Sequence, residues 1–258
     1  MGRLFASFRL WERTSQIAFG LALLLLVIVA AAYLSGAENL RQPSAIGVFG
    51  LLIILQIIIL WANRGMVTPY TQAQRHYLAG NFAEAVRLLE GVRQAGKADV
   101  RALTLLGNTY RQEGHLEESE AVLREALELQ PNHHFSLYGF GRTLMVMGRY
   151  AEASEVFIQA HEAGAPEIVR LDLGEAFYRH GETQQALEWL MSAEPAAYEP
   201  YQALMLAYLM YRLGQGQPPT SDLLQAGLPF WEASAGRFRH TPYGQALAED
   251  VRVMQLMI

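Results

Sequence analysis

Two long apolar runs dominate the first part of the chain, and neither has a polar face. The first extends from Ile17 to Leu34 and the second from Ala45 to Ala62, each of eighteen residues. As a helix, eighteen residues span roughly 27 Å, close to the thickness of the hydrocarbon core of a bilayer. Trp11, Tyr33 and Trp61 lie near the ends of these runs, where aromatic side chains favour the membrane interface. The pattern predicts two transmembrane helices, in a hairpin covering residues 1–65.

Small residues and a single amide are the points at which this hairpin could meet other helices. Glycines let transmembrane helices approach closely, and an amide inside a span hydrogen-bonds a neighbouring helix. We therefore expect contacts with the transmembrane helices of a larger complex, and with lipid, around the positions Gly20, Gly47, Gly50 and Gln56.

The arginines that flank the runs predict their orientation. The connection Ser35–Ser44 holds one arginine, Arg41, which Glu38 offsets. Because cytoplasmic flanks carry the excess of basic residues, both termini are expected in the cytoplasm, with the hairpin in a bacterial inner membrane. The alternative is a cleaved signal peptide ending near Ser35-Gly36-Ala37, with the remaining chain in the periplasm. The flanking arginines are Arg3, Arg9, Arg13, Arg64 and Arg75.

After the hairpin, glycines recur at a nearly constant interval among helical patterns of apolar residues. Five of them are separated by 34, 34, 33 and 33 residues. Such periods are typical of helical repeat arrays, in which each unit packs on the next. The five glycines are Gly80, Gly114, Gly148, Gly181 and Gly214.

Three successive units resemble the tetratricopeptide repeat at more than the turn glycine. In the unit Leu103–Pro131, a small residue and an aromatic residue stand seven and four positions before the turn glycine. The next two units have a glycine at the same place seven positions before the turn glycine, and the unit around Gly181 also has the aromatic. The unit around Gly80 has His76 where an aromatic is usual. The matching residues are Gly107, Tyr110, Ala126 and Pro131, then Gly141, Gly148, Tyr150, Ala153, Phe157 and Ala160, then Gly174, Phe177, Gly181, Ala186 and Ala193.

The resemblance implies an all-α fold in which the transmembrane hairpin is followed by an α-solenoid of four to five helix–turn–helix units. It covers about Val67–Gly214, so the array is assigned to residues 66–215. Residues 216–258 are predicted to be a capping region. Gly216, Pro218 and Pro219 leave two alternatives there, either a late helix near Ser221–Leu228 or an array that has already ended.

The end of the chain has the pattern of a terminal capping helix. Thr241 is a good N-cap residue, and Pro242 suits the first helical turn. Apolar residues recur at helical spacing and suit packing over the last repeat. These residues are Leu247, Val251, Met254 and Ile258.

Composition excludes several functional classes. The net charge is −5 and the basic residues are not clustered, so nucleic acid is not an expected partner. The chain has no cysteine, and its seven histidines form neither an HxxxH pair nor an HExxH motif, so we expect no metal site. It also has no glycine-rich phosphate loop in a strand–turn–helix context and no GxSxG motif. We expect a non-catalytic protein without a cofactor.

The resemblance implies that the first helix of each unit lines an inner groove that binds protein partners. The residues at these positions are rich in arginine and tyrosine, although the whole chain is acidic. Arginine takes carboxylates in bidentate fashion, which suits an acidic or extended peptide. We expect replacement of Arg111, Arg142 and Arg179 with glutamate to abolish capture of the partner and to leave thermal stability nearly unchanged. The predicted groove residues are Arg101, Asn108, Arg111, Tyr138, Arg142, Glu175, Tyr178, Arg179, Tyr208, Tyr211 and Arg212.

These features favour a membrane-anchored adaptor or scaffold that mediates protein–protein interaction, as an accessory or assembly subunit of a bacterial inner-membrane complex. A periplasm-facing envelope-assembly factor is one alternative, because it needs only the opposite topology. A membrane enzyme or small transporter with a helical binding domain is a weaker one. It would need catalytic or pore-lining groups, and Gln56 is the one strongly polar side chain within the two runs.

Overall fold

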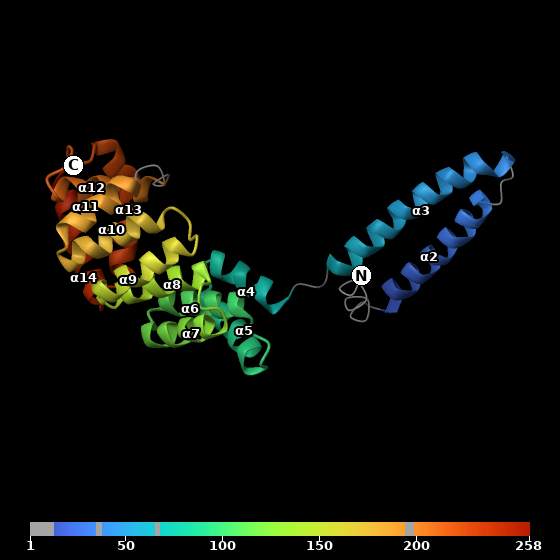
Figure 1. Ribbon diagram of the computed structural model, residues 1–258, viewed down its shortest axis with the longest axis horizontal. Helices are drawn as coiled ribbons and strands as arrows, with labels where there is room; N and C mark the ends of the chain where they lie inside the picture. The colour runs from blue at the N-terminus through green and yellow to red at the C-terminus, as the bar shows by residue number, and fades with distance from the viewer. Residues whose placement is uncertain (1–12, 35–37, 65–67, 194–198) are drawn as a thin grey trace. The chain divides into compact units, whose positions relative to one another are not determined.

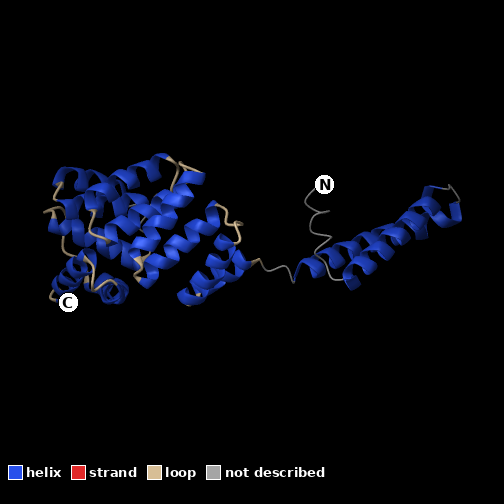
Figure 2. Cartoon of the chain, turned by 90° about the horizontal axis from the view of Figure 1, so that it is seen from below, coloured by secondary structure: helices blue, strands red, loops and turns tan. Residues whose placement is uncertain are grey.

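The computed structural model describes residues 13–34, 38–64, 68–193 and 199–258. The described residues are helical, with turns and loops between the helices and no strands among them (Figure 2). The chain divides into two compact units, residues 1–68 and 69–258. Trp11 and the connection Ser35–Ala37 lie outside the described residues.

The first unit is a pair of helices. α2 (Arg13–Leu34) and α3 (Glu38–Arg64) pack along each other as an antiparallel hairpin (Figure 1). Of the helices described, α2 alone has the length and composition to span a membrane, over Thr14–Leu34 with a mean hydropathy of 2.8. The uninterrupted apolar stretch of α3 is shorter, at Ala45–Trp61. The second predicted span is therefore a helix, but its apolar part is shorter than that of the first.

The predicted contact positions of this hairpin differ in their surroundings. Gly47 faces α2, because a Cβ atom built there would lie 3.0 Å from Val29 Cγ1. The same construction at Gly20 and Gly50 meets no atom within 4 Å. Gln56 is exposed. Within the hairpin, one of the glycines thus serves the packing of α2 on α3, and the other positions face outward.

The second unit begins with an array of paired helices. In chain order they are α4 (Pro69–Leu78), α5 (Phe82–Gln94), α6 (Val100–Glu113), α7 (Leu116–Leu129), α8 (His134–Val146), α9 (Tyr150–Glu162), α10 (Val169–His180), α11 (Thr183–Ala193), α12 (Pro200–Arg212) and α13 (Ser221–Arg237). Each pair packs on the next, and the first helices of successive pairs also touch one another.

The periodic glycines lie at the turn inside each pair, as expected. Their φ angles, between 75° and 89°, fall in the left-handed region that ends a helix without steric cost in glycine. Gly114 and Gly181 are the C-caps of α6 and α10. This geometry explains the period in the sequence.

The small residue of each first helix lets the second helix approach closely. A Cβ atom built on Gly107 would lie 2.5 Å from Leu123 Cγ, and one on Gly141 would lie 2.6 Å from Phe157 Cδ1. In the last pair the arrangement is reversed. There Gly227 of α13 comes close to Leu204 of α12, whereas Ala207, seven positions before Gly214, is only half-buried.

Two glycines with opposite surroundings test this packing. Gly174→Ala should destabilise the second unit by about 1–3 kcal/mol, because its Cβ would lie 2.7 Å from Leu190 Cγ and 3.1 Å from the Leu190 backbone nitrogen. Gly91→Ala, in α5 with no atom within 4 Å, should stabilise it by about 0.5–1 kcal/mol. Thermal unfolding of the two variants would show shifts of opposite sign, and equal shifts would contradict the close approach at Gly174.

The region after Gly214 follows the first of the two alternatives, a late helix. Thr220 caps α13 by accepting a hydrogen bond from the Leu223 amide. The helix is longer than expected, because it continues through Pro229 to Arg237. α14 (Pro242–Gln255) follows, with Thr241 as its N-cap, as the sequence indicates.

α14 does more than cover the last pair. It packs on α13 and also on α8, more than ninety residues earlier in the chain (Figure 1). At the start of α14, Pro242 lies close to Gly148. A Cβ atom built on Gly148 would lie 2.7 Å from Pro242 Cβ. The terminal helix thus reaches the third pair of the array and contacts residues predicted to form the groove.

Candidate protein-binding groove

The groove positions of the fourth and fifth pairs are occupied by a carboxylate of the chain itself. Asp250, on α14, accepts a hydrogen bond from Tyr208 Oη at 2.9 Å and from Arg179 Nη2 at 2.9 Å. Arg212 Nη1 lies 3.9 Å from Asp250 Oδ1 and donates to Tyr208 Oη at 2.6 Å. The predicted arginines and tyrosines therefore do gather around an acid, which the chain supplies itself.

Arg179 is the centre of this cluster. Its side chain is 5% exposed and also pairs with Glu175 at 2.6 Å, while its guanidinium lies over the Tyr243 ring at 4.9 Å from the centroid. Burial alone would lower the pKa of Arg179, but the charges of Glu175, Tyr243 and Asp250 raise it above its ordinary value. Burial raises the pKa of Glu175. Arg179 is thus an internal ion-pair residue, and its charge reversal should destabilise the fold, in contrast to the expectation from the sequence.

The predicted groove residues of the third pair contact a second acid, Asp172 of the fourth pair. Tyr138 donates a hydrogen bond from Oη to Asp172 Oδ2, and Arg142 Nη1 lies 3.3 Å from the same oxygen. Asp172 belongs to α10, so these contacts tie the third pair to the fourth. Burial, and next the charge of Asp172, raise the pKa of Tyr138 above its ordinary value. Arg142 keeps part of its side chain exposed.

Arg111, in the second pair, lacks such a partner. Its residue is 6% exposed, and Nη1 donates to Asn108 Oδ1 at 2.8 Å and to the Gly139 carbonyl at 3.1 Å. Both acceptors are neutral. Burial, and next the charge of Arg142, lower the pKa of Arg111 to about 10. This guanidinium is held in place by dipoles rather than by an acid.

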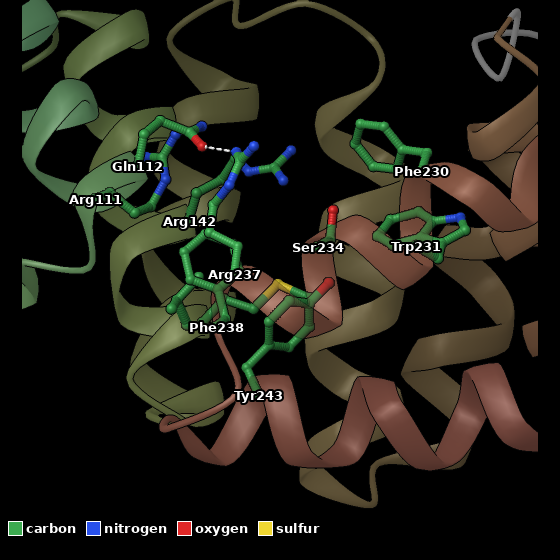
Figure 3. Close-up of a pocket in the computed structure, with 11 residues that line it drawn as sticks. Arg111, Gln112, Arg142, Phe230, Trp231, Ser234, Arg237, Phe238 and Tyr243 are labelled. Carbon is green, nitrogen blue, oxygen red and sulfur yellow. Dashed lines mark hydrogen bonds between the residues drawn. The ribbon is translucent and has the colours of Figure 1, made fainter. Parts of the chain in front are cut away.

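A cavity of about 110 Å³ adjoins Arg111, between α6, α8, α13 and α14 (Figure 3). The basic side chains Arg111, Arg142 and Arg237 line it, and Arg237 donates from Nη1 to Gln112 Oε1. In Figure 3, Phe230 and Trp231 of α13 lie across the cavity from the side chains of α6 and α8. The complete lining is Arg111, Gln112, Arg142, Met145, Val146, Phe230, Trp231, Ser234, Arg237, Phe238 and Tyr243.

The remaining predicted residues are less buried. Arg101 is exposed and pairs with Asp99 at 3.2 Å, near the start of α6. Asn108 and Tyr178 are half-buried, and Tyr211 is 39% exposed. The structure therefore brings Glu175, Arg179, Tyr208 and Arg212 together around Asp250, and places Arg101 and Tyr211 outside both clusters.

Sequence reasoning missed Asp172, Asp250, Arg237 and Trp231. For Asp250 a signal was present, because it lies on the apolar stripe of the last helix beside Leu247 and Val251. An acid on an apolar face indicates a buried partner. Arg237 and Trp231 belong to α13, for which the repeat pattern gave no positions.

Comparison with known proteins agrees with the paired helices. A tetratricopeptide repeat model matches residues 76–139, and a second tetratricopeptide repeat model matches residues 138–200. Residues 76–200 are thus similar to tetratricopeptide repeats. No curated protein matches the chain.

Solved structures of repeat proteins are similar to this chain. A thermophilic TPR protein of Thermus thermophilus is 18% identical with a TM-score of 0.53, over 73% of this chain and 97% of that one. MamA of Desulfovibrio magneticus RS-1 is 19% identical with a TM-score of 0.49, over 72% and 91%. MamA AMB-1 is 25% identical with a TM-score of 0.48, over 58% and 89%. The Thermus structure supports the solenoid fold of the second unit.

Proposed function

We propose that this protein is a membrane-anchored, non-catalytic adaptor whose tetratricopeptide repeats hold a protein partner at the bacterial inner membrane. The repeats support a role in protein–protein interaction, since arrays of this kind present extended binding surfaces.

The observation that carries the anchor is the uncovered apolar surface of the hairpin. Only 6% of the apolar window in α2 is buried, and Ile17 and Val27 are about as exposed as Phe49 and Ile57 of α3. A core helix of a soluble protein would bury these side chains, and a patch of this extent is typical of a membrane or partner contact. The hairpin is proposed to lie in the bilayer and to meet other transmembrane helices at Gly20, Gly50 and Gln56.

Confinement to the membrane also means that a groove with weak affinity for its partner is enough to hold it. Tethering to the membrane raises the effective concentration of a neighbouring membrane complex, so that weak contacts hold it. An accessory or assembly subunit fits this arrangement, with an acidic or extended segment of the partner in contact with the repeats. The cytoplasmic orientation follows from the arginine distribution alone.

Cysteine labelling tests anchor and orientation together, because the chain has no cysteine of its own. Ser35→Cys, between the two apolar runs, should react with a membrane-impermeant maleimide added to intact spheroplasts. Ala248→Cys, exposed on α14, should react only after permeabilisation. The reverse pattern would instead support a periplasm-facing factor, and release of the protein by alkaline carbonate would refute the anchor.

Co-purification tests the adaptor role. We expect mild-detergent extraction of the tagged full chain to recover defined subunits of a membrane complex, identified by mass spectrometry. Loss of these subunits from a variant lacking residues 1–65 would locate their contact in the hairpin. Retention would locate it in the repeats, and recovery of no stoichiometric partner by either form would contradict an adaptor.

A further inference from the structure

We propose that the cavity lined by Arg111, Arg142 and Arg237 binds a carboxylate group of a peptide partner. The inference rests on the proposed interaction role and names the chemistry that the partner brings. The site is built partly from α13, so it is not a property of the repeats alone.

The first step is the pattern of acids along the array. Arg142 has Asp172 at 3.3 Å, and Arg179 has Asp250 at 2.9 Å. Asp250 belongs to α14, which is not part of the repeats. Its carboxylate contacts the groove residues Arg179 and Tyr208 as the carboxylate of a bound ligand would. Inner-surface arginines of this array therefore do accept carboxylates, once burial has removed competing water.

The second step is that Arg111, unlike Arg142 and Arg179, has no carboxylate partner. Among the residues that the structure describes, no carboxylate lies within 4.0 Å of Arg111, whose two acceptors are an amide and a carbonyl oxygen. A buried cation without an acid destabilises a fold, and such groups cluster at functional sites. The pKa of Arg111 is lowered because burial and the neighbouring Arg142 disfavour its charge and outweigh the opposite effect of the more distant Asp172. An incoming anion would relieve this cost.

The third step is the chemistry of the cavity. Its eleven lining residues, all in the described part of the chain, include three arginines and no acid. A water molecule needs about 10–15 Å³, so about 110 Å³ has room for a carboxylate and adjoining carbon atoms rather than for a larger ligand. Phe230, Trp231 and Phe238 provide apolar contact for those carbons.

A peptide supplies a carboxylate from an acidic side chain or from its C-terminus, and probe peptides separate the two. The first is an acetylated tetrapeptide of three alanines and a final phenylalanine with a free carboxylate. The second has the same sequence with a C-terminal amide, and the third is an amide with aspartate before the phenylalanine. We expect the full chain in detergent to bind the first or third at least about tenfold more tightly than the neutral second. Whichever acidic peptide binds identifies the source.

Two variants and a matched control locate the binding. Arg237→Ala removes an exposed side chain, whose contacts are Gln112 and the ring of Phe82, and should weaken binding about tenfold. Arg239→Ala, also exposed and bonded to its neighbour His240, should leave affinity unchanged. Equal loss in both variants would point to general charge attraction and would overturn the site.

Arg111→Met separates a binding residue from a structural one. If Arg111 serves to bind the carboxylate of a partner, Arg111→Met should abolish binding of the acidic peptide. The midpoint of thermal unfolding of the free protein should stay the same or rise. A fall in the midpoint with binding retained would overturn the inference, as would equal affinity for the neutral peptide or no binding of any probe.

Partner co-purification that survives Arg111→Met and Arg237→Ala would refute the carboxylate site alone. Absence of any partner for the wild type would refute the proposed function.

Discussion

Arg179→Met is expected to destabilise the second unit by about 3–5 kcal/mol. The substitution removes the cation that lies within 4 Å of both Glu175 and Asp250, and it leaves two buried carboxylates without that shared partner. Breaking such a pair from one side is costly, because the remaining charge keeps its desolvation penalty without the attraction. For a unit of this size the midpoint of thermal unfolding should fall by roughly 10 °C.

The deficit of Arg179→Met should also depend on pH. Burial raises the pKa of Glu175 in the folded protein, so the folded state holds its proton at pH values where the unfolded state has lost it. The contribution of such a group to the free energy of unfolding falls as pH rises from its pKa in the unfolded state through its pKa in the folded state. Without the cation, the variant should therefore be closer to the wild type at pH 5 than at pH 8.

Circular dichroism of the full chain in mild detergent at the two pH values measures both effects. Arg87→Met is the matched control, because Arg87 forms an i,i+3 pair with Glu84 at 2.5 Å but is two-thirds exposed. It should unfold at the same temperature as the wild type. If Arg179→Met matches this control, the cluster around Asp250 does not hold α14 on the array.

The paired helices were predictable because their determinants are local. A turn needs a residue that accepts positive φ, and close helix contact needs a residue without a large side chain. Both demands recur every 33 or 34 residues, from Gly80 to Gly214. The cap of α14 was predictable for the same reason, since Thr241 accepts a hydrogen bond from the amide only three residues ahead.

The contact of α14 with the groove was not predictable from the repeat pattern. Spacing assigned Arg179 to the inner surface, where the structure has it, but spacing says nothing of a partner 71 residues away in the chain. The same holds for α13, whose helix continues through Pro229, because tertiary packing of Trp231 outweighs the local cost of proline. The role of the predicted groove residues in capturing a partner stays a prediction.

Phe157→Ala is the second substitution with a large expected effect, a loss of about 3–5 kcal/mol. Phe157 is fully buried in α9, against the backbone of Gly141 and 6.0 Å from the ring of Tyr138. Because Gly141 has no side chain, it offers no atoms that could move in to fill the space left by the ring. The lost contacts and the cavity therefore both contribute.

The position of Phe157 makes the consequence larger than a local one. In a repeat array each unit is stabilised by its neighbours, so weakening the third pair weakens the connection between the first two pairs and the fourth and fifth pairs. Hydrogen exchange of the full chain should show faster exchange first in α8 and α9, and then in α6 and α7, with α10 and α12 held by the Asp250 cluster. Phe135→Ala, in the same pair but 51% exposed, should leave exchange unchanged. Uniform loss of protection across the second unit would instead mean that it unfolds as a single cooperative block, and that the array transmits the damage to Asp250 and its partners.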